Sequence, residues 1–367
     1  MSYIYYKKDW PRMTWDHERP AGQLAGVRHR QGRLIGRMAG LGFSLRNEAV
    51  LQTLTEDVLK SNEIEGEKLD KDQVRSSIAR RLGLDLGGLV AVGRHVEGVV
   101  EMMLDATGHY TDPLTEERLF AWHAALFPTG RSGMSPIAVG RWRDEQSDLM
   151  QVVSGPIGRE KLHYQAPEAK RVPGEMHAFL KCFNNPQSID PVLTAGLAHL
   201  WFVTIHPFED GNGRIARAIA DMALARSENS TQRFYSMSAQ ICLERNAYYG
   251  MLEKTQKGGL DITAWQEWFL GCLDRAIEGA EHILAGIFRK ARFWESHSQK
   301  SFNDRQRAII NLLFDDFEGK LTSSKWARLA KCSQDTALRD IDDLLKHGVL
   351  VKEPGGGRST SYALAAL

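Results

Sequence analysis

The stretch HPFEDGNGRIAR, residues 206–217, gathers residue types that could bind a polyphosphate. Gly211 and Gly213 permit the positive φ angles and the close backbone approach that a nest of N–H groups needs. A helix is predicted to start in this loop, and its positive N-terminal end attracts anions. Arg214 and Arg217 share one face of its first turns. Two arginines at that end are unfavourable unless an anion lies there, so the pattern predicts a polyphosphate site.

His206 and Asp210 add acid–base and metal-binding chemistry to the same loop. The apolar run Val192–Ile205 is predicted to be a buried, central helix, and Pro207 ends it because proline cannot continue an α-helix. His206 is then held at the mouth of the loop, where its imidazole can accept a proton. The carboxylate of Asp210 is suited to hold Mg²⁺. The alternative, a glycine-rich loop with a core histidine and two surface arginines, leaves the combination of residue types unexplained.

Helices are expected to position this loop, because helical periodicity dominates the chain. Apolar residues recur at helical spacing from Ala21 to Leu41, and the arginines between them are predicted to form a solvated basic face. Further helices are predicted at Leu45–Lys60 and Leu89–Asp105, and another after Thr115 as its N-cap.

One region breaks the helical pattern. Leu149–Ser154 and Lys161–Ala166 are short extended runs on either side of a Gly/Pro turn. This pattern predicts a β-hairpin.

Beyond Lys290 the pattern becomes that of a small separate domain. The predicted elements are helices at Arg305–Phe317, Ser323–Lys331 and Ser333–His347 and strands at Gly348–Lys352 and Ser361–Leu364. Three helices followed by a hairpin form the winged-helix pattern. The expected fold is therefore mainly α, with a helical N-terminal region (1–110), a helical core with its following helices (111–298) and a winged-helix domain (299–367).

Composition excludes several classes of protein. The chain has 367 residues, 43% of them hydrophobic and 25% charged, which suits a globular protein of two or three domains. Its 47 basic and 46 acidic residues argue against a wholesale polyanion binder. No run of about 18 apolar residues suggests a membrane span. The N-terminus lacks the apolar core of a secretory signal, and the four scattered cysteines suit a reducing compartment, so a cytoplasmic location is expected.

At residues 206–217 the sequence resembles the Fic family of protein AMP-transferases. Every position of the family signature H-x-F-x-[D/E]-G-N-G-R-x-x-R is matched. The resemblance implies a helical core and transfer of AMP from ATP to a protein hydroxyl. It implies that His206 is the base and that Asp210 holds Mg²⁺. The ATP-binding residues that it implies are Gly211, Asn212, Gly213, Arg214, Ile215, Ala216, Arg217, Leu243 and Tyr249.

The last two of these lie downstream of the signature. Tyr248-Tyr249 resembles a nucleotide-contacting element of the family, and Leu243 could line the same apolar wall. Gln256 stands where relatives often have asparagine. For these residues, contact with the base and packing between helices are both open.

The predicted hairpin resembles the family's flap. An open strand edge can accept a target segment through main-chain hydrogen bonds, which aligns its hydroxyl with the α-phosphate. The alternative is a structural hairpin that covers the core. The docking residues implied are Val152, Val153, Ser154, Leu162, His163 and Tyr164.

Upstream, SNEIEG at 61–66 resembles the family's inhibitory motif, [S/T]-x-x-x-E-[G/N]. It assigns inhibitory roles to Ser61, Glu65 and Gly66. Glu65 is predicted to pair with Arg217 and to replace the γ-phosphate there, so that ATP binds in an unreactive pose. The alternative is a solvated acidic helix end.

The sequence thus predicts a self-inhibited protein adenylyltransferase that modifies Ser, Thr or Tyr hydroxyls of target proteins and of itself. One alternative is a Fic-type enzyme that removes AMP or moves another phosphate-bearing group. Another is a DNA-binding regulator, although Ser333–His347 carries four aspartates against Arg339 and Lys346, which disfavours DNA. A homodimer is expected from the resemblance and from N-terminal aromatic residues taken to be exposed: Tyr3, Tyr5, Tyr6, Trp10 and Trp15.

Overall fold

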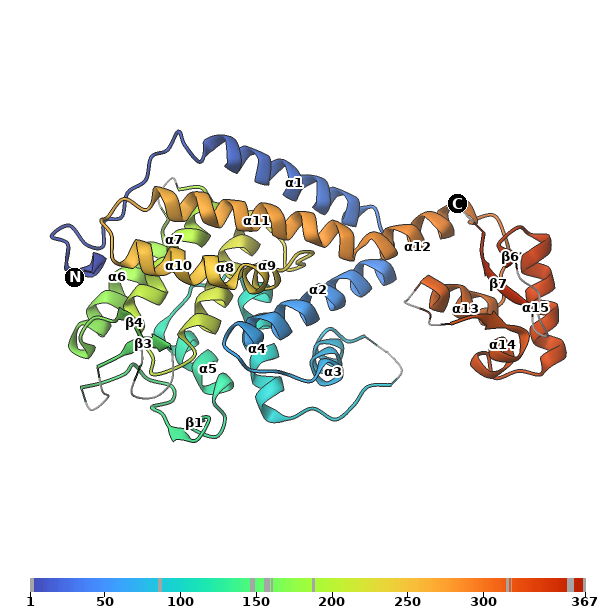
Figure 1. Cartoon of the computed structure of the whole chain (residues 1–367), viewed down its shortest axis with the longest axis horizontal. Coiled ribbons are helices and arrows are strands. Elements are labelled where there is room, and N and C mark those ends of the chain that lie inside the picture. The colour runs from blue at the N-terminus through green and yellow to red at the C-terminus, as the bar shows by residue number, and fades with distance from the viewer. Residues whose placement is uncertain are drawn as a thin grey trace. The chain divides into compact units, whose positions relative to one another are not determined.

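A computed structural model describes residues 3–84, 88–145, 149–154, 159, 161–186, 189–314, 317, 319–354 and 360–365. The fold is mainly helical, as predicted (Figure 1). The chain divides into two compact units, one of Met1–Gly40 with Arg46–Glu281 and one of Leu41–Leu45 with His282–Leu367. The N-terminal helical region therefore belongs to the same unit as the core. The C-terminal part of the second unit begins at His282, before the predicted boundary at residue 299.

The first unit contains most of the helices. They are α1 (Ala21–Ala39), α2 (Phe43–Ile64), α3 (Lys71–Arg81), α4 (Arg94–Gly108), α5 (Glu116–Leu126), α6 (Val172–Asn184), α7 (Pro191–Ile205), α8 (Asn212–Glu228), α9 (Met237–Leu243), α10 (Arg245–Gln256) and α11 (Thr263–Ile283). Two antiparallel hairpins join them, β1 (Arg131–Ser132) with β2 (Ser135–Pro136) and β3 (Gln151–Ser154) with β4 (Lys161–Gln165). Short 3₁₀ turns lie at Ile4–Tyr6 and Ala169–Arg171.

Helices α7 and α8 form the centre of this unit. Every residue of α7 from Val192 to Ile205 is buried, which confirms the prediction of a central helix. Pro191 starts the helix where its missing N–H costs nothing, and Asp190 caps it by accepting a hydrogen bond from the Val192 N–H at 2.8 Å. The helix ends at His206, directly before Pro207.

Helices α4 and α5 approach each other so closely that their backbones touch. A Cβ atom on Gly98 of α4 would lie 1.8 Å from the carbonyl oxygen of Ala125 in α5. Glycine is therefore required at this crossing. Thr115 caps α5 as predicted, because its hydroxyl accepts a hydrogen bond from the Arg118 N–H.

Arginines of α1 form ion pairs with acidic residues of α11. Helix α1 runs alongside α11 (Figure 1), and Arg30 pairs with Asp274 at 2.7 Å while Arg33 pairs with Glu281 at 2.8 Å. The side chains of Arg30, Arg33 and Arg37 are still 41–50% exposed, so the predicted basic face is open to solvent. Its pairing with acidic residues of α11 could not be predicted from the periodicity of α1 alone.

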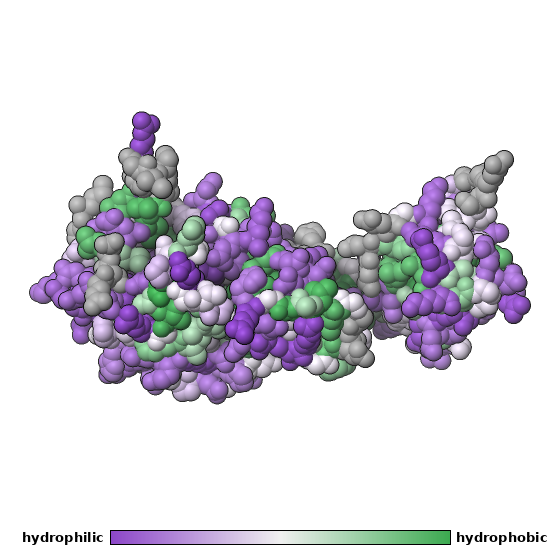
Figure 2. Space-filling model, turned by 90° about the horizontal axis from the view of Figure 1, so that it is seen from below, coloured by the Kyte–Doolittle hydropathy of each residue, from purple (hydrophilic) through white to green (hydrophobic). Residues whose placement is uncertain are grey.

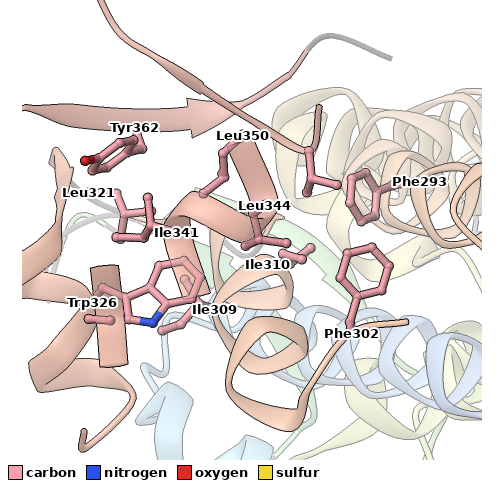
Figure 3. Close-up of a cluster of buried hydrophobic side chains, with 12 residues drawn as sticks. Phe293, Phe302, Ile309, Ile310, Leu321, Trp326, Ile341, Leu344, Leu350 and Tyr362 are labelled. Atoms are coloured by element: carbon pink, nitrogen blue, oxygen red, sulfur yellow. The ribbon is translucent and has the colours of Figure 1, made fainter. Parts of the chain in front are cut away.

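The second unit has its own hydrophobic core (Figure 3). It contains α12 (Ala285–Ser296), α13 (Asp304–Phe314), α14 (Ser323–Leu329), α15 (Gln334–Lys346) and the strands β5 (Leu321–Thr322), β6 (Leu350–Lys352) and β7 (Ser361–Leu364). The strands form an antiparallel sheet in the order β5-β7-β6. Trp326 of α14 is fully buried among side chains of α13 and α15, and Phe293 extends this core to α12. Since Phe293 belongs to this core, the unit begins before the predicted boundary.

The N-terminal aromatic residues are not the exposed group that the homodimer expectation assumed. Tyr3 and Tyr5 are buried against Tyr164 of β4, and only Tyr6, at 57%, is strongly exposed. Figure 2 shows one face of the molecule, where hydrophobic patches are separated by hydrophilic surface. Within the part of the chain that the structure describes, no helix is both long enough and apolar enough to span a bilayer.

Candidate active site

His206 lies at the junction of α7 and the loop to α8, in a left-handed conformation with φ 53° and ψ 59°. Its Nδ1 atom is 3.1 Å from the carbonyl oxygen of Val203. Because a carbonyl oxygen only accepts, Nδ1 must carry the proton of the neutral ring. The Nε2 lone pair is then left to accept a proton from another group.

Burial also keeps His206 neutral. Removal from water lowers its pKa to about 4, and the positive charge of Arg143 acts in the same direction. At neutral pH the imidazole is therefore a base with its lone pair available.

Asn212 shapes the loop from within. Its side-chain oxygen accepts a hydrogen bond from the Phe208 N–H at 3.0 Å, and its amide donates to the Phe208 carbonyl at 2.8 Å. Phe208 in turn stacks on His123, with 4.2 Å between the ring centroids. Gly211 has φ 80°, and a Cβ there would lie 2.9 Å from the Phe127 ring. The side chain of Asn212 thus holds the loop, and only its backbone N–H remains for a ligand.

The N-terminus of α8 presents donors without acceptors. The backbone N–H groups of Asn212, Gly213 and Arg214 make no hydrogen bond to any described residue. Two guanidinium nitrogens nearby, Nε of Arg214 and Nη1 of Arg217, are buried and also without acceptors. A helix N-terminus with unpaired N–H groups and two arginines is an anion site.

Arg217 is held by the end of α2. Its Nη2 lies 2.7 Å from Oε1 of Glu65 and donates to the Ser61 carbonyl, while its Nε donates to the Ser61 hydroxyl. A Cβ on Gly213 would lie 2.3 Å from the same Glu65 oxygen. The Glu65 carboxylate therefore lies directly over the first turn of α8.

Arg214 has a carboxylate partner that sequence reasoning missed. Its Nη1 lies 2.8 Å from Oε2 of Glu67, and its guanidinium lies over the Phe127 ring. Gly66, at φ 84°, ends α2 in a Schellman turn in which the Glu67 N–H bonds to the Asn62 carbonyl. This turn directs the residue after Gly66 toward α8. A glycine followed by an acidic residue at a predicted helix end was the available signal.

Ile215 and Ala216 follow Arg214 in the first turns of α8, and both are fully buried. Their role as ATP-binding residues stays a prediction.

Asp210 fits a Mg²⁺ site of the kind completed by phosphate oxygens. One of its oxygens accepts a hydrogen bond from the Gly211 N–H at 2.6 Å, the other from the Ser132 hydroxyl, and the side chain is 42% exposed. Among the described residues no group of three or more His, Cys, Asp or Glu side chains could hold a metal. Mg²⁺ commonly uses one or two carboxylates and takes its other ligands from substrate and water, so the single carboxylate fits.

The predicted hairpin is formed by β3 and β4, and two of its side chains are bonded to helices of the same unit. The Tyr164 side chain is buried and its hydroxyl donates to the Thr204 carbonyl at 2.5 Å. His163 pairs with Glu253 of α10 at 2.7 Å. Val153 and Leu162 face each other across the strands and are exposed. The hairpin is thus anchored through His163 and Tyr164, and its exposed side chains are Val153 and Leu162.

The remaining two predicted docking residues of the hairpin are Val152 and Ser154. Val152 packs against the cluster of Tyr3, Tyr5 and Tyr164. The side chain of Ser154 lies outside the described residues, although its backbone pairs with Lys161.

Of the three residues downstream of the signature, two are at least partly buried and one is exposed. Tyr249 is half-buried, with its hydroxyl 3.4 Å from the Ile64 carbonyl at the end of α2. Gln256 is buried and points its amide at the Val203 carbonyl at 3.5 Å. Leu243, at 81%, is exposed at the end of α9. Tyr249 therefore lies beside the end of α2.

Arg143 was missed because no motif surrounds it. This buried arginine donates from Nε to the His206 carbonyl at 2.7 Å and from its backbone N–H to the Pro207 carbonyl at 2.9 Å. It links the loop before β3 to the loop that carries His206.

Comparisons with known proteins agree with this geometry. Residues 113–224 match the Fic/DOC family, and residues 3–84 match a domain of unknown function, DUF4172. The chain is 24% identical to "Protein adenylyltransferase Fic" of Nematostella vectensis over 63% of its own length and 49% of that protein. It is also 24% identical to the protein of the same name from Drosophila mojavensis, over 59% of its length and 39% of that protein. The chain thus covers less than half of each relative.

Two solved structures share the fold. A Fic family protein from Desulfovibrio desulfuricans G20 superposes with a TM-score of 0.55 at 21% identity, covering 94% of this chain and 96% of that one. A Fic domain containing signaling protein from Bacteroides thetaiotaomicron VPI-5482 has a TM-score of 0.51 at 19% identity, covering 70% of this chain and 96% of that one. The helical fold around an anion-binding loop is that of a Fic domain. Residues 113–224 of this chain therefore form a Fic/DOC-type domain.

Proposed function

We propose that this protein is an adenylyltransferase that moves AMP from ATP to a hydroxyl group of a protein. The observation that carries the proposal is the neutral His206 imidazole, with its Nε2 lone pair available, at the loop whose next residues present unpaired N–H groups to an anion. The printed name of the curated relatives, protein adenylyltransferase, supports the same reaction.

In this reaction Nε2 of His206 accepts the proton of the attacking Ser, Thr or Tyr hydroxyl. The hydroxyl oxygen bonds to the α-phosphorus of ATP as the bond to the bridging β-phosphate oxygen breaks, and pyrophosphate leaves with that electron pair. The N–H groups at the start of α8 and the guanidinium of Arg214 stabilise charge on the phosphate oxygens. No covalent intermediate with the protein is required.

Asp210 would hold Mg²⁺ together with phosphate oxygens of ATP. When bound, the ion would neutralise part of the negative charge on these oxygens. The hydrogen bonds from Gly211 and Ser132 orient the Asp210 carboxylate for this role.

We further propose that the end of α2 restrains this activity within the same chain. Glu65 pairs with Arg217 and Glu67 pairs with Arg214, so both arginines are engaged by carboxylates where phosphates would bind. ATP must displace these carboxylates before its phosphates can reach both guanidinium groups. The contacts of Ser61 with Arg217 support the same inhibitory role.

ATP labelled at either the α- or the γ-phosphate tests the reaction. Incorporation into protein only from the α-position is expected. Incorporation only from the γ-position would overturn the proposal. Release of AMP from a previously modified protein, with no incorporation from either position, would identify the alternative of AMP removal.

The alternative function, DNA binding by the second unit, is not favoured by the charges on α15. Two of the four aspartates of α15 are engaged by α13, since Asp340 pairs with Arg305 at 2.8 Å and Asp343 accepts from Gln306 at 2.8 Å. Asp335 and Asp342 then oppose Arg339 and Lys346, which leaves no positive excess on this helix. We therefore favour a protein-contact role. If the protein shifts a non-specific DNA duplex in a gel at low salt, that result would contradict the protein-contact role.

A further inference from the structure

The C-terminal end of α7 has carbonyl groups that one buried side chain collects. Arg143 is 4% exposed. Its Nη2 donates to the Pro167 carbonyl at 2.6 Å and is 3.4 Å from the Ile205 carbonyl. Its Nε and backbone N–H bind the carbonyls of the next two residues, His206 and Pro207. The last carbonyls of a helix have no partner within the helix, and Arg143 supplies one.

Among the described residues, no carboxylate balances the charge of Arg143. None of the ion pairs formed by the described residues includes it, and burial lowers its pKa. A buried cation is costly unless other groups stabilise it. Here the negative end of the α7 dipole and hydrogen bonds to carbonyl oxygens stabilise it. Neutral donors could satisfy these carbonyls, so the presence of a cation requires another reason.

The backbone of His206 supplies one reason. A non-glycine residue at φ 53° is strained, and it persists only where its surroundings hold it. Arg143 binds the carbonyls immediately before, at and after this residue. It also binds Pro167, two residues beyond the end of β4, so that one side chain joins the flap to the histidine.

We propose that Arg143 is a positioning residue that holds His206 at a set distance from the flap and in its proton-accepting form. The inference rests on the proposed function for what the imidazole does. The contacts themselves do not depend on it. A target hydroxyl aligned along the flap would meet Nε2 only if the flap and His206 keep their relative position.

Among the described residues, three charged groups act most strongly on the His206 ring. Arg143 acts from the loop before β3, Glu65 from α2 and Asp210 from the loop before α8. Arg143 disfavours the imidazolium, and the two carboxylates favour it. Removal of the Arg143 charge should therefore make His206 easier to protonate.

The experiment follows the His206 ring by NMR in protein labelled with ¹³C-histidine, without substrate, using His206→Ala to assign its signal. In Arg143→Gln the midpoint of the titration should rise by about one pH unit, since a like charge nearby shifts a pKa by roughly this amount or more. Arg143→Lys keeps the charge and loses the fork of hydrogen bonds, so its midpoint should stay near that of the parent. The matched control is Arg141→Gln, because Arg141 lies two residues away, exposed, and pairs with Asp144.

Kinetics separate positioning from general stability. In Arg143→Lys the KM for the target protein should rise several-fold, while the dissociation constant of ATP, measured by calorimetry, stays unchanged. An unchanged titration midpoint in Arg143→Gln, or an unchanged target KM in Arg143→Lys, would overturn the proposal. If the parent transfers no label from ATP, the proposed function fails, whereas the titration still reports on Arg143. If Arg143→Gln does not fold, the lysine variant alone decides.

Discussion

His206 combines a fixed tautomer with a low pKa, and each property has a separate cause. The tautomer follows from the hydrogen bond to Val203, and the low pKa follows from burial. We expect His206→Ala to abolish label transfer and to leave ATP affinity nearly unchanged, because the phosphates are held by α8. Filter-binding of labelled protein and calorimetry of ATP measure the two effects. Transfer at the parent rate would show that His206 is not the base.

The pH dependence of transfer follows from the same residue. Because the pKa of His206 is lowered to about 4, the ring is neutral from pH 5 upward and loses its basic form only below that range. Since this pKa is that of the protein without nucleotide, the acid limb of kcat/KM should lie near pH 4 rather than near 6.5. Initial rates at low substrate concentration, taken from below pH 4 up to pH 8, measure it. A midpoint near 6.5 would mean that His206 is solvated during the reaction.

At this scale, residues that are close in sequence could be predicted and distant partners could not. The signature brings the base, the metal carboxylate and both arginines together within one loop, so spacing alone was informative. Ser132, Arg143 and Glu67 reach the loop from elsewhere in the chain through turns that no periodicity describes. The two hydrogen bonds between the Asn212 side chain and Phe208 depend on how the loop closes, so the sequence alone could not predict them.

At the scale of elements, the end of α2 decides whether α8 can bind phosphate. We expect Glu65→Gly to raise transfer, including self-modification, by roughly ten- to a hundredfold, since a charge-assisted pair contributes about 1–3 kcal/mol. Arg217→Ala in the same chain should abolish the gain, because it removes the shared partner. Incorporated α-label per protein is the measurement.

The control for this variant is Glu63→Gly. Glu63 pairs with Lys60 and its side chain is 47% exposed, and among the described residues no hydrogen bond or ion pair joins it to α8, so its loss should change transfer little. Equal incorporation by the parent and by Glu65→Gly would refute inhibition through α2.

Glu67 should affect a different part of the nucleotide. The resemblance to the Fic family implies that Arg214 binds the β-phosphate and that Arg217 binds the γ-phosphate. We therefore expect Glu67→Gln to improve the binding of both ADP and ATP, whereas Glu65→Gly should improve the binding of ATP only. Because Glu67 is about half exposed, its pair is worth about 0.5–1 kcal/mol, or roughly two- to fivefold in affinity. Calorimetry with both nucleotides measures this difference. Identical ADP affinity in Glu67→Gln and the parent would contradict it.

Helices and strands could be predicted from the sequence where a pattern of apolar residues extended over enough positions. The central helix α7 and the hairpin β3–β4 follow from an apolar run and from two extended runs around a turn. The hairpin β1–β2 has two residues in each strand, too few for an alternating pattern. The ion pairs between α1 and α11 join residues more than two hundred positions apart, so only the folded chain reveals them.

At the scale of the whole molecule, the two units have separate cores. Trp326→Ala should therefore unfold the second unit alone, because removing a fully buried tryptophan costs about 3–5 kcal/mol and this side chain packs within that unit only. Calorimetric scans should lose one transition. ATP binding at the first unit should persist, and its loss would show that the units are not independent.

The boundary between the units was the least predictable feature at this scale. Sequence patterns locate elements, but a boundary depends on which core each element joins, and Phe293 assigns α12 to the second. The dimer expectation now rests on the family resemblance, since Tyr3 and Tyr5 are buried within the chain.

The contact between Gly98 and Ala125 has a genetic consequence. Any larger residue at position 98 must push two helices apart, yet neither helix supplies the residues of the α7–α8 loop. An alanine at this position would weaken the packing of the first unit, including that of α5, whose His123 stacks on Phe208 of the loop. In a cell such a change would act as a heat-sensitive allele: the protein would fold at low temperature and unfold on warming. A shift in temperature would then remove the folded protein at a chosen time.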